Sequence, residues 1–305
     1  MRRHLDLVEA VGRVVSDIAT GYNGVQAPEH HGTAEGTAMA LLSAFADEIS
    51  KDFDEQLAIL VETGVTHVEL RGVWGKNVLK LTPREIRDVR ASADAEGIGF
   101  SAIGSPLGKF PLAGDFNEQL EGVRRALEYA QVLEAPYVRL FSYHIPKGDA
   151  AADHRTQVMD WLGQLSAEAE QTDIVLAHEN ESGIYGDTGA RCLDLIETLG
   201  SDSFTTIFDF SNYAVGGEDL LANWESLKDH TSYFHIKDFD CDARKVVPAG
   251  DGDGHLEPIL RDAYARGFDG FLSLEPHLRE EYGDIGAERF RAAVAGLNRV
   301  LAAIA

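Results

Sequence analysis

Short apolar runs alternate with amphipathic helical segments from residue 38 to the end of this chain, and this alternation limits its possible folds more than any other feature. Most runs are continuously apolar, which is typical of parallel strands that are buried on both faces. We predict eight strands, at Leu41–Ala46, His67–Leu70, Gly99–Gly104, Tyr137–Ser142, Ile174–Ala177, Phe204–Phe208, Tyr233–Ile236 and Gly270–Leu274.

The segments between these runs carry helix signals. Asp52 with Glu55, and Thr82 with Glu85, have the spacing of N-terminal helix caps. Gly64 and Gly97 follow the same two segments, at the position where a helix end favours a left-handed residue. Strands that alternate with helices pair in parallel through crossover connections, so the chain is expected to be an α/β protein.

Eight such repeats in residues 38–305 match the size of a closed (β/α)8 TIM barrel, which has about 250 residues. The rival is a doubly wound open sheet, which often carries a glycine fingerprint after its first strand. Residues 47–50 read Asp-Glu-Ile-Ser there, without glycine. We therefore predict a single barrel domain over 38–305. Residues 1–37 form an N-terminal extension, a short helix plus a linker, which is either a loose tail or a helix that packs on a partner subunit.

Composition restricts the partners. Lys and Arg number 27 against 51 Asp and Glu, giving a net charge of −24. This charge argues against nucleic acid and against an anionic membrane surface, because both need a basic face. The two cysteines, Cys192 and Cys241, exclude a disulfide framework and fit a reducing, cytoplasmic location. The chain has no apolar run of the length that spans a bilayer, about 18 residues, and no secretory signal pattern at its start.

Acidic and imidazole side chains follow the last four predicted strands. In a TIM barrel the carboxyl ends of the strands build the active site. Strands five to eight deliver Glu179, Asp209, His235 and Glu275 to this end. Each could instead cap a helix or form a surface ion pair, but carboxylates that cluster repel one another unless a cation compensates. Three carboxylates with one imidazole suit Mn²⁺, Mg²⁺ or Co²⁺, with Zn²⁺ less favoured. We expect one divalent metal ion, with Mn²⁺ first.

Four segments in this order resemble the sugar phosphate isomerases/epimerases, which are xylose isomerase-like TIM barrels. They read Leu-Ala-His-Glu-Asn (176–180), Phe-Asp-Phe-Ser-Asn (208–212), Phe-His-Ile-Lys-Asp (234–238) and Leu-Glu-Pro (274–276). The resemblance covers residues 40–303. It implies that Glu179, Asp209, His235 and Glu275 ligate one divalent metal ion, and that Glu179 and Glu275 also exchange a substrate proton. Many members have a histidine shortly after the ligand that corresponds to Asp209. In this chain, Asn212 lies near that position instead.

Other side chains at the strand ends are candidates for substrate binding. His144 follows strand four and can donate to a substrate hydroxyl. Lys237 can hold a substrate oxyanion or pair with Asp238. Arg71 and Trp74 can form a wall against which a sugar stacks. Asn180 can orient the substrate, and Glu181 can replace Glu179 as a ligand if the strand register shifts. The predicted substrate-binding residues are Arg71, Trp74, His144, Asn180, Asn212, Lys237 and Asp238.

The resemblance favours an isomerase or epimerase that acts on a ketose or related sugar through a metal-stabilised enediolate. The alternative is a lyase on the same scaffold, which would expel a group from an oxidised sugar such as a 3-keto-glycoside or an inosose. An abasic-site endonuclease needs a basic face, which the charge disfavours. A non-catalytic sugar-binding barrel is a further alternative. Relatives are often oligomers or work with a small partner subunit, so we expect a homo-oligomer or such a partner.

Overall fold

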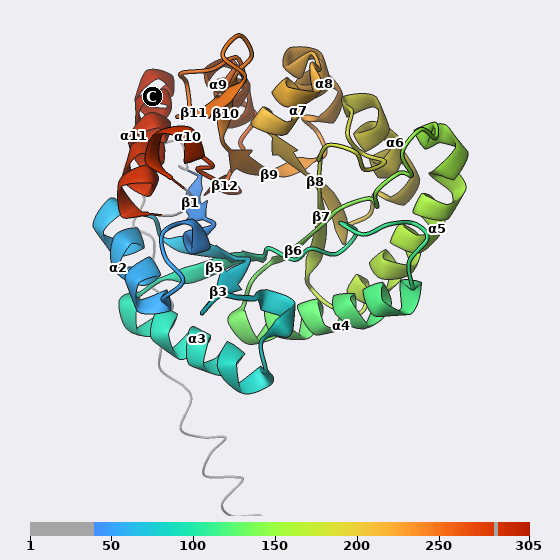
Figure 1. The fold of residues 1–305 in the computed structure, drawn as a ribbon, viewed down its shortest axis with the longest axis horizontal. Coiled ribbons are helices and arrows are strands. Elements are labelled where there is room, and N and C mark those ends of the chain that lie inside the picture. The colour runs from blue at the N-terminus through green and yellow to red at the C-terminus, as the bar shows by residue number, and fades with distance from the viewer. Residues whose placement is uncertain (1–39, 284–285) are drawn as a thin grey trace, which may run out of the picture. The chain divides into compact units, whose positions relative to one another are not determined.

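The computed structural model describes residues 40–283 and 286–305. These described residues belong to one compact unit. Eight parallel strands close into a barrel in the order β1-β12-β9-β8-β7-β6-β5-β2, and Figure 1 looks down this barrel with the helices around it. The predicted (β/α)8 fold is confirmed. The barrel strands are β1 (Leu41–Ala44), β2 (His67–Leu70), β5 (Gly99–Ile103), β6 (Tyr137–Leu140), β7 (Val175–Glu179), β8 (Phe204–Asp209), β9 (Thr231–Ile236) and β12 (Phe271–Leu274).

All eight predicted strands are present, and their ends differ from the prediction by at most two residues, the usual scatter of such boundaries. The predicted helix and linker within residues 1–37 lie outside the described residues. Two hairpins that the sequence did not reveal interrupt the alternation, one after β2 and one after β9. They consist of β3 (Gly72–Val73) with β4 (Lys76–Asn77), and β10 (Asp238–Asp240) with β11 (Lys245–Val247).

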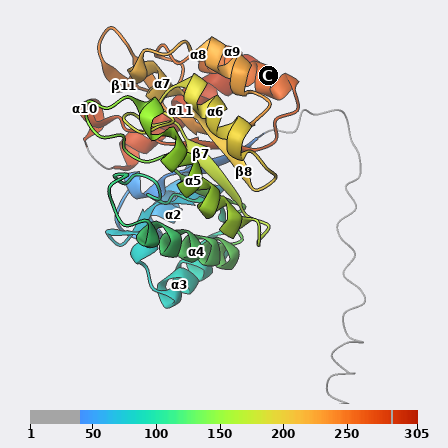
Figure 2. The same cartoon turned by 90° about the vertical axis from the view of Figure 1, so that its right-hand side faces the viewer.

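Helices form the outer layer of the barrel. Viewed from the side, α3, α4, α5 and α6 follow one another around its outside (Figure 2). None of the described helices has the length and apolar character to cross a bilayer. The helices are α2 (Phe53–Thr63), α3 (Pro83–Glu96), α4 (Phe116–Leu133), α5 (Ala151–Ala169), α6 (Gly189–Leu199), α7 (Phe210–Gly216), α8 (Leu220–Leu227), α9 (Leu256–Ala265), α10 (Arg279–Tyr282) and α11 (Ala287–Ile304), with short 3₁₀ turns η1 (Ala46–Glu48) and η2 (Val78–Lys80).

The predicted helix signals act as expected. The Asp52 side chain accepts hydrogen bonds from the second and third amides of α2. Thr82 and Glu85 form a reciprocal capping box at the start of α3. Gly64 and Gly97 end these two helices in the left-handed conformation, with φ of 75° and 69°. These local signals fix where each helix begins and ends, and so where each following strand enters the barrel.

Two cores lie on the two faces of the strands. Side chains that point outward pack against the helices in the large apolar core, for example Phe208, Phe234 and Leu272. The inward side chains form a much smaller apolar cluster of Ala102, Ala177, Ile207, Tyr233 and Phe271. Inward positions recur every second residue along a strand. Each of these strands therefore has a further inward side chain two residues after its residue in this cluster, nearer the carboxyl end. Polar residues occupy most of those upper positions.

Candidate metal centre

Four side chains meet at the carboxyl end of the barrel, and they are the four that we predicted as metal ligands. Glu179, Asp209, His235 and Glu275 each offer one ligand atom that lies within 4.8 Å of the other three. All four are buried, with at most 4% of any residue exposed. They stand two residues above Ala177, Ile207, Tyr233 and Ser273 on their strands. The inward period of two therefore brings them into one layer.

The donor atoms in this layer fit a divalent cation. His235 Nδ1 lies 3.2 Å from Glu179 Oε1 and 3.6 Å from Asp209 Oδ2. His235 Nδ1 is buried and has no hydrogen-bond partner among the described residues. Buried polar atoms are normally paired, so an unpaired nitrogen that faces two carboxylate oxygens suits a shared ligand. Three oxygen donors with one imidazole match the preferences of hard or borderline divalent ions.

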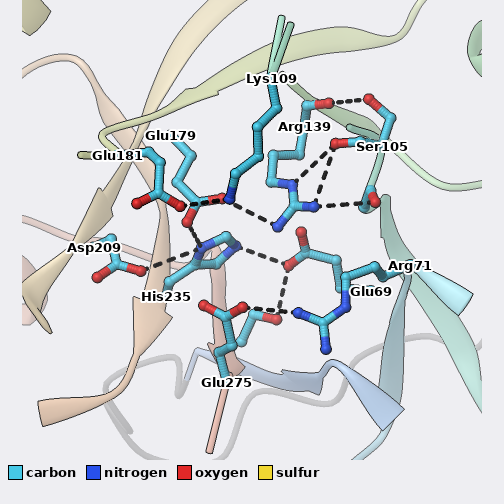
Figure 3. Close-up of polar contacts among 12 residues, drawn as sticks. Glu69, Arg71, Ser105, Lys109, Arg139, Glu179, Glu181, Asp209, His235 and Glu275 are labelled. Carbon is cyan, nitrogen blue, oxygen red and sulfur yellow. Dashed lines mark hydrogen bonds and ion pairs between the residues drawn. The ribbon is translucent and has the colours of Figure 1, made fainter. Parts of the chain in front are cut away.

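Each of the two glutamates is also held by an arginine (Figure 3). Arg139 Nη1 donates to Glu179 Oε2 over 3.1 Å. Arg71 Nη1 donates to Glu275 Oε1 over 2.9 Å. In both cases one carboxylate oxygen is fixed by a guanidinium and the other is left for the cluster. Glu179 and Glu275 lie on either side of His235 in the close-up, and their strands β7 and β12 are separated by β8 and β9 in the barrel.

Lys237 places an ammonium group inside the cluster. Its Nζ lies 2.9 Å from Asp209 Oδ2 and also contacts Glu275 Oε2. Burial alone lowers the pKa of Lys237, but the charges of Asp209 and Glu275 outweigh it and raise the pKa above its ordinary value. Lys237 was predicted to face the substrate or to pair with Asp238. It reaches the site and pairs with two of the metal-ligand candidates instead.

The charges of the cluster shift its pKa values in opposite directions. Burial raises the pKa of Glu179, but His235 and Arg139 overcome this and bring it to about 2. Burial likewise opposes the ionised form of Glu275, whereas Lys237, His277 and Arg71 hold its pKa well below the ordinary value. Burial lowers the pKa of His235, and the charges of Glu179 and Glu69 raise it well above the usual range. The protein surroundings therefore favour a positive charge at this point, which a proton or a metal ion can supply.

A further buried glutamate, Glu48, shares its partners Arg71 and His277 with Glu275. Glu48 Oε1 contacts Arg71 Nη2 at 3.2 Å and His277 Nε2 at 3.0 Å, and Glu48 Oε2 contacts Arg289. His277 Nε2 is also 3.2 Å from Glu275 Oε1. Cationic side chains already neutralise this group, so it acts as a support for Glu275 rather than as an open cation site.

Asn180 and Asp238, which we predicted as substrate-binding residues, use their polar atoms in hydrogen bonds to the backbone. Asn180 accepts from the amide of Asp209 over 2.9 Å and donates to the carbonyl of Asp209 over 3.1 Å. Asp238 accepts four backbone N–H bonds, at 2.8 to 3.0 Å, from Phe239, Gly250, Gly252 and Gly254. Asn180 thus fixes Asp209, and Asp238 fixes the glycine-rich loop.

The remaining candidates occupy the rim. Asn212 Nδ2 donates to Glu179 Oε1 over 3.3 Å and to the carbonyl of Asn180, so it joins the site. Glu181 does not replace Glu179, since it pairs with Lys109 over 2.7 Å. His144 is half-buried on the rim and bridges Pro111 and Ile184 through its backbone. Trp74 lies at the turn of the β3–β4 hairpin with 41% of its surface exposed. Substrate contacts for Asn212, His144 and Trp74 stay predictions.

Two site residues were missed from the sequence as functional groups. Arg139 lies inside β6, where an inward side chain is usually aliphatic in such a barrel. Glu69 ends up fully buried on β2, 3.0 Å from His235 Nε2. Glu69 was visible at a strand end, but nothing in the sequence indicated its partner. An inward polar residue in the upper half of a strand would have been the signal for both.

Comparison with known proteins places the chain in a family. The family model of xylose isomerase-like TIM barrels matches residues 57–299. The chain belongs to this family. No curated protein matches it by sequence.

Solved structures share the xylose isomerase-like barrel at low sequence identity. The IolI protein with a bound zinc atom is 18% identical, with a TM-score of 0.72 over 88% of this chain and 99% of that chain. The probable 3-DHS dehydratase AsbF from Bacillus anthracis is 17% identical, with a TM-score of 0.69 over 85% and 99%. The 3-keto-D-glucoside 4-epimerase YcjR from E. coli is 17% identical, with a TM-score of 0.65 over 87% and 99%. These similarities concern the fold.

Proposed function

We propose that the protein is a divalent-metal-dependent isomerase or epimerase of a ketose or related sugar. The observation that carries this proposal is the pair of buried glutamates, Glu179 and Glu275, which share one cluster with Asp209 and His235. A divalent cation held by these four residues would act as a Lewis acid toward the carbonyl oxygen and the adjacent hydroxyl of the sugar. The oxygen-rich donor set favours Mn²⁺, with Mg²⁺, Co²⁺ and Zn²⁺ as alternatives.

Glu179 and Glu275 are the groups that would move the proton. One carboxylate takes a proton from the carbon next to the carbonyl, and the other returns a proton from the opposite side. Return to the same carbon inverts its configuration, whereas return to the neighbouring carbon moves the carbonyl. Arg139 and Arg71 hold one oxygen of each glutamate and thereby fix the direction in which the other oxygen faces. Fixed reacting groups are a large part of enzymatic rate enhancement.

A lyase is the second candidate, and Lys237 is the observation in its favour. Its ammonium contacts Glu275 inside the cluster and can donate a proton to a leaving hydroxyl or aglycone. The structural neighbours include a probable dehydratase as well as an epimerase, which fits either outcome. The mass of the product separates the two: an isobaric product supports isomerisation or epimerisation, and loss of water or an aglycone supports elimination.

The test is solvent exchange at the carbon next to the carbonyl. Protein loaded with Mn²⁺ is incubated in D₂O with a panel of ketoses and keto-sugars, and deuterium incorporation is followed by NMR and mass spectrometry. We expect exchange by the wild type, and a loss of about 10²-fold or more in Glu275→Gln and Glu179→Gln. Glu168→Gln, which changes a partly exposed carboxylate on α5, is the matched control and should exchange normally. An absence of exchange with every sugar would contradict the proposal.

A further inference from the structure

A buried glutamate, Glu69, contacts the metal-site histidine inside the barrel. Glu69 Oε2 accepts three hydrogen bonds, from His235 Nε2 at 3.0 Å, Tyr233 Oη at 2.8 Å and Ser273 Oγ at 2.8 Å. Glu69 is on β2, and its three donors are on β9 and β12. All four residues are fully buried. The barrel interior at this level is therefore a polar network, where aliphatic side chains are the usual filling.

No ion pair between Glu69 and a lysine or arginine is seen among the described residues. In the same part of the chain, Glu69 pairs with the imidazole of His235. Its other oxygen, Oε1, is buried and has no hydrogen-bond partner among the same residues. A carboxylate buried in this way is strongly unfavourable unless a positive group compensates. The imidazole of His235 is in direct contact with Glu69 and can carry the compensating charge, and Arg71 adds a Coulomb attraction from farther away.

The contact with Glu69 also decides which nitrogen of His235 faces the cluster. A carboxylate accepts hydrogen bonds and cannot donate them, so Nε2 carries the proton in the bond to Glu69. The lone pair of the neutral ring is then on Nδ1. That nitrogen is the atom 3.2 Å from Glu179 Oε1 and 3.6 Å from Asp209 Oδ2, and it has no hydrogen-bond partner in the described structure.

We propose that Glu69 is the positioning residue that fixes His235 as a metal ligand through Nδ1. Carboxylates that accept from the second nitrogen of a ligand histidine orient the ring and strengthen its bond to the metal. This inference rests on the proposed function, because it requires that the cluster binds a metal ion. It adds a residue from the first half of the barrel to a site whose four ligand candidates all come from the second half.

Further contacts hold Glu69 itself in place. Tyr233 Oη lies 2.8 Å from Ser101 Oγ, which lies 2.5 Å from Ser43 Oγ. The network thus runs from β1 through β5 and β9 to Glu69 on β2. Because Tyr233 and Ser273 donate to the same oxygen as His235, loss of one of them leaves the contact between Glu69 and His235 intact. This arrangement supplies a matched control.

Metal affinity tests the proposal without any substrate. Metal-free wild type, Glu69→Gln, Glu69→Leu and Tyr233→Phe are titrated with Co²⁺, followed by its visible absorption, and with Zn²⁺ by chelator competition. We expect affinity to fall by about 10-fold in Glu69→Gln, which keeps an acceptor without the charge, and by about 100-fold in Glu69→Leu. Tyr233→Phe, the control, should stay within about 3-fold of the wild type because the contact with His235 remains.

NMR of ¹⁵N-histidine-labelled protein with Zn²⁺ gives a second readout, which a role in packing alone would not change. We expect His235 to be protonated at Nε2 and metal-bound at Nδ1 in the wild type, and this pattern to be lost in Glu69→Leu. If Glu69→Leu does not fold, Glu69→Gln carries the test. Wild-type affinity in both Glu69 variants would overturn the role of Glu69 alone, whereas failure of the wild type to bind any ion would overturn the proposed function.

Discussion

Arg139 Nη1 donates to Glu179 Oε2 over 3.1 Å, and both side chains are almost completely buried. The guanidinium is held independently of Glu179, because it also donates to the carbonyls of Gly104 and Ser105 and lies over the rings of Phe45 and Phe141 at 5.0 and 4.9 Å. Glu179 is therefore fixed against a rigid support. Its second oxygen is left to face His235.

Loss of this arginine should harm both stability and activity. Arg139→Met leaves the carboxylate of Glu179 buried without its partner, which should lower the free energy of unfolding by about 3–5 kcal/mol. Deuterium exchange should fall by about 10²-fold because Glu179 is no longer held in place. Arg124→Met, which removes an exposed pair with Glu168, is the control and should change stability by less than about 1 kcal/mol. Urea unfolding measures the first effect, and an unchanged unfolding curve for Arg139→Met would contradict the account.

Lys237 and a metal ion compete for the same carboxylates. The ammonium contacts Asp209 and Glu275, so a bound divalent ion must share these groups with a positive charge. Lys237→Met should therefore bind Mn²⁺ about 10-fold more tightly than the wild type, since the Coulomb repulsion is removed, while proton exchange slows. Lys228→Met, at a surface pair with Glu225, should leave affinity unchanged. Isothermal titration calorimetry measures these Mn²⁺ affinities. Weaker binding by Lys237→Met than by the wild type would contradict the prediction and show that Lys237 supports the metal site.

Asp238 should be important for stability through the loop over residues 250–254. Its two oxygens accept four hydrogen bonds from backbone N–H groups. Asp238→Asn replaces one oxygen by an NH₂ group, which cannot accept and would face the backbone N–H donors. We expect the free energy of unfolding to fall by about 3 kcal/mol. Asp240→Asn changes a carboxylate that, among the described residues, accepts one hydrogen bond, from the Ala243 amide, so it should cost about 1 kcal/mol or less. Equal effects of the two substitutions in urea unfolding would contradict this assignment.

His178 should make stability depend on pH. Burial lowers the pKa of His178 from its ordinary value of 6.5 to about 4, so the folded chain binds fewer protons there than the unfolded chain between these values. Stability from this group is complete above pH 6.5 and falls as the pH decreases toward 4, by up to about 3 kcal/mol. His178→Gln should lose this part of the pH dependence. Unfolding of metal-free protein at several pH values is the measurement, and identical slopes for the two proteins would count against a buried neutral imidazole.

The sequence was sufficient for the fold and for the four ligand candidates, and the reason is geometric. Parallel strands in a barrel end at one rim, so the residues at the ends of predicted strands become neighbours even when 26 to 40 residues separate them in the chain. Glu179, Asp209, His235 and Glu275 follow from this rule alone. A small error in a strand end did not matter, because each ligand is the last inward residue of its strand or the residue just past it.

Supporting residues could not be predicted in the same way, since they depend on side-chain direction across the barrel. Arg139 and Glu69 contact residues that are 40 and 166 positions away in the chain. Asp238 was predicted as a substrate-binding residue because it follows a strand end next to a candidate ligand, and its carboxylate turns toward backbone amides of the glycine-rich loop. One sequence gives the strand and its period, but the hydrogen-bond partner of an inward polar group appears only in three dimensions.

The metal content of the protein tests the central claim most directly. Purified wild type is loaded with Mn²⁺, Co²⁺ or Zn²⁺, desalted and analysed by inductively coupled plasma mass spectrometry beside Asp209→Ala and His235→Ala. The account predicts one bound ion for each wild-type chain and strongly reduced binding in both variants, because the cluster supplies four ligands from four strands. A wild type that retains none of these ions, or variants that retain them as well as the wild type does, would contradict it.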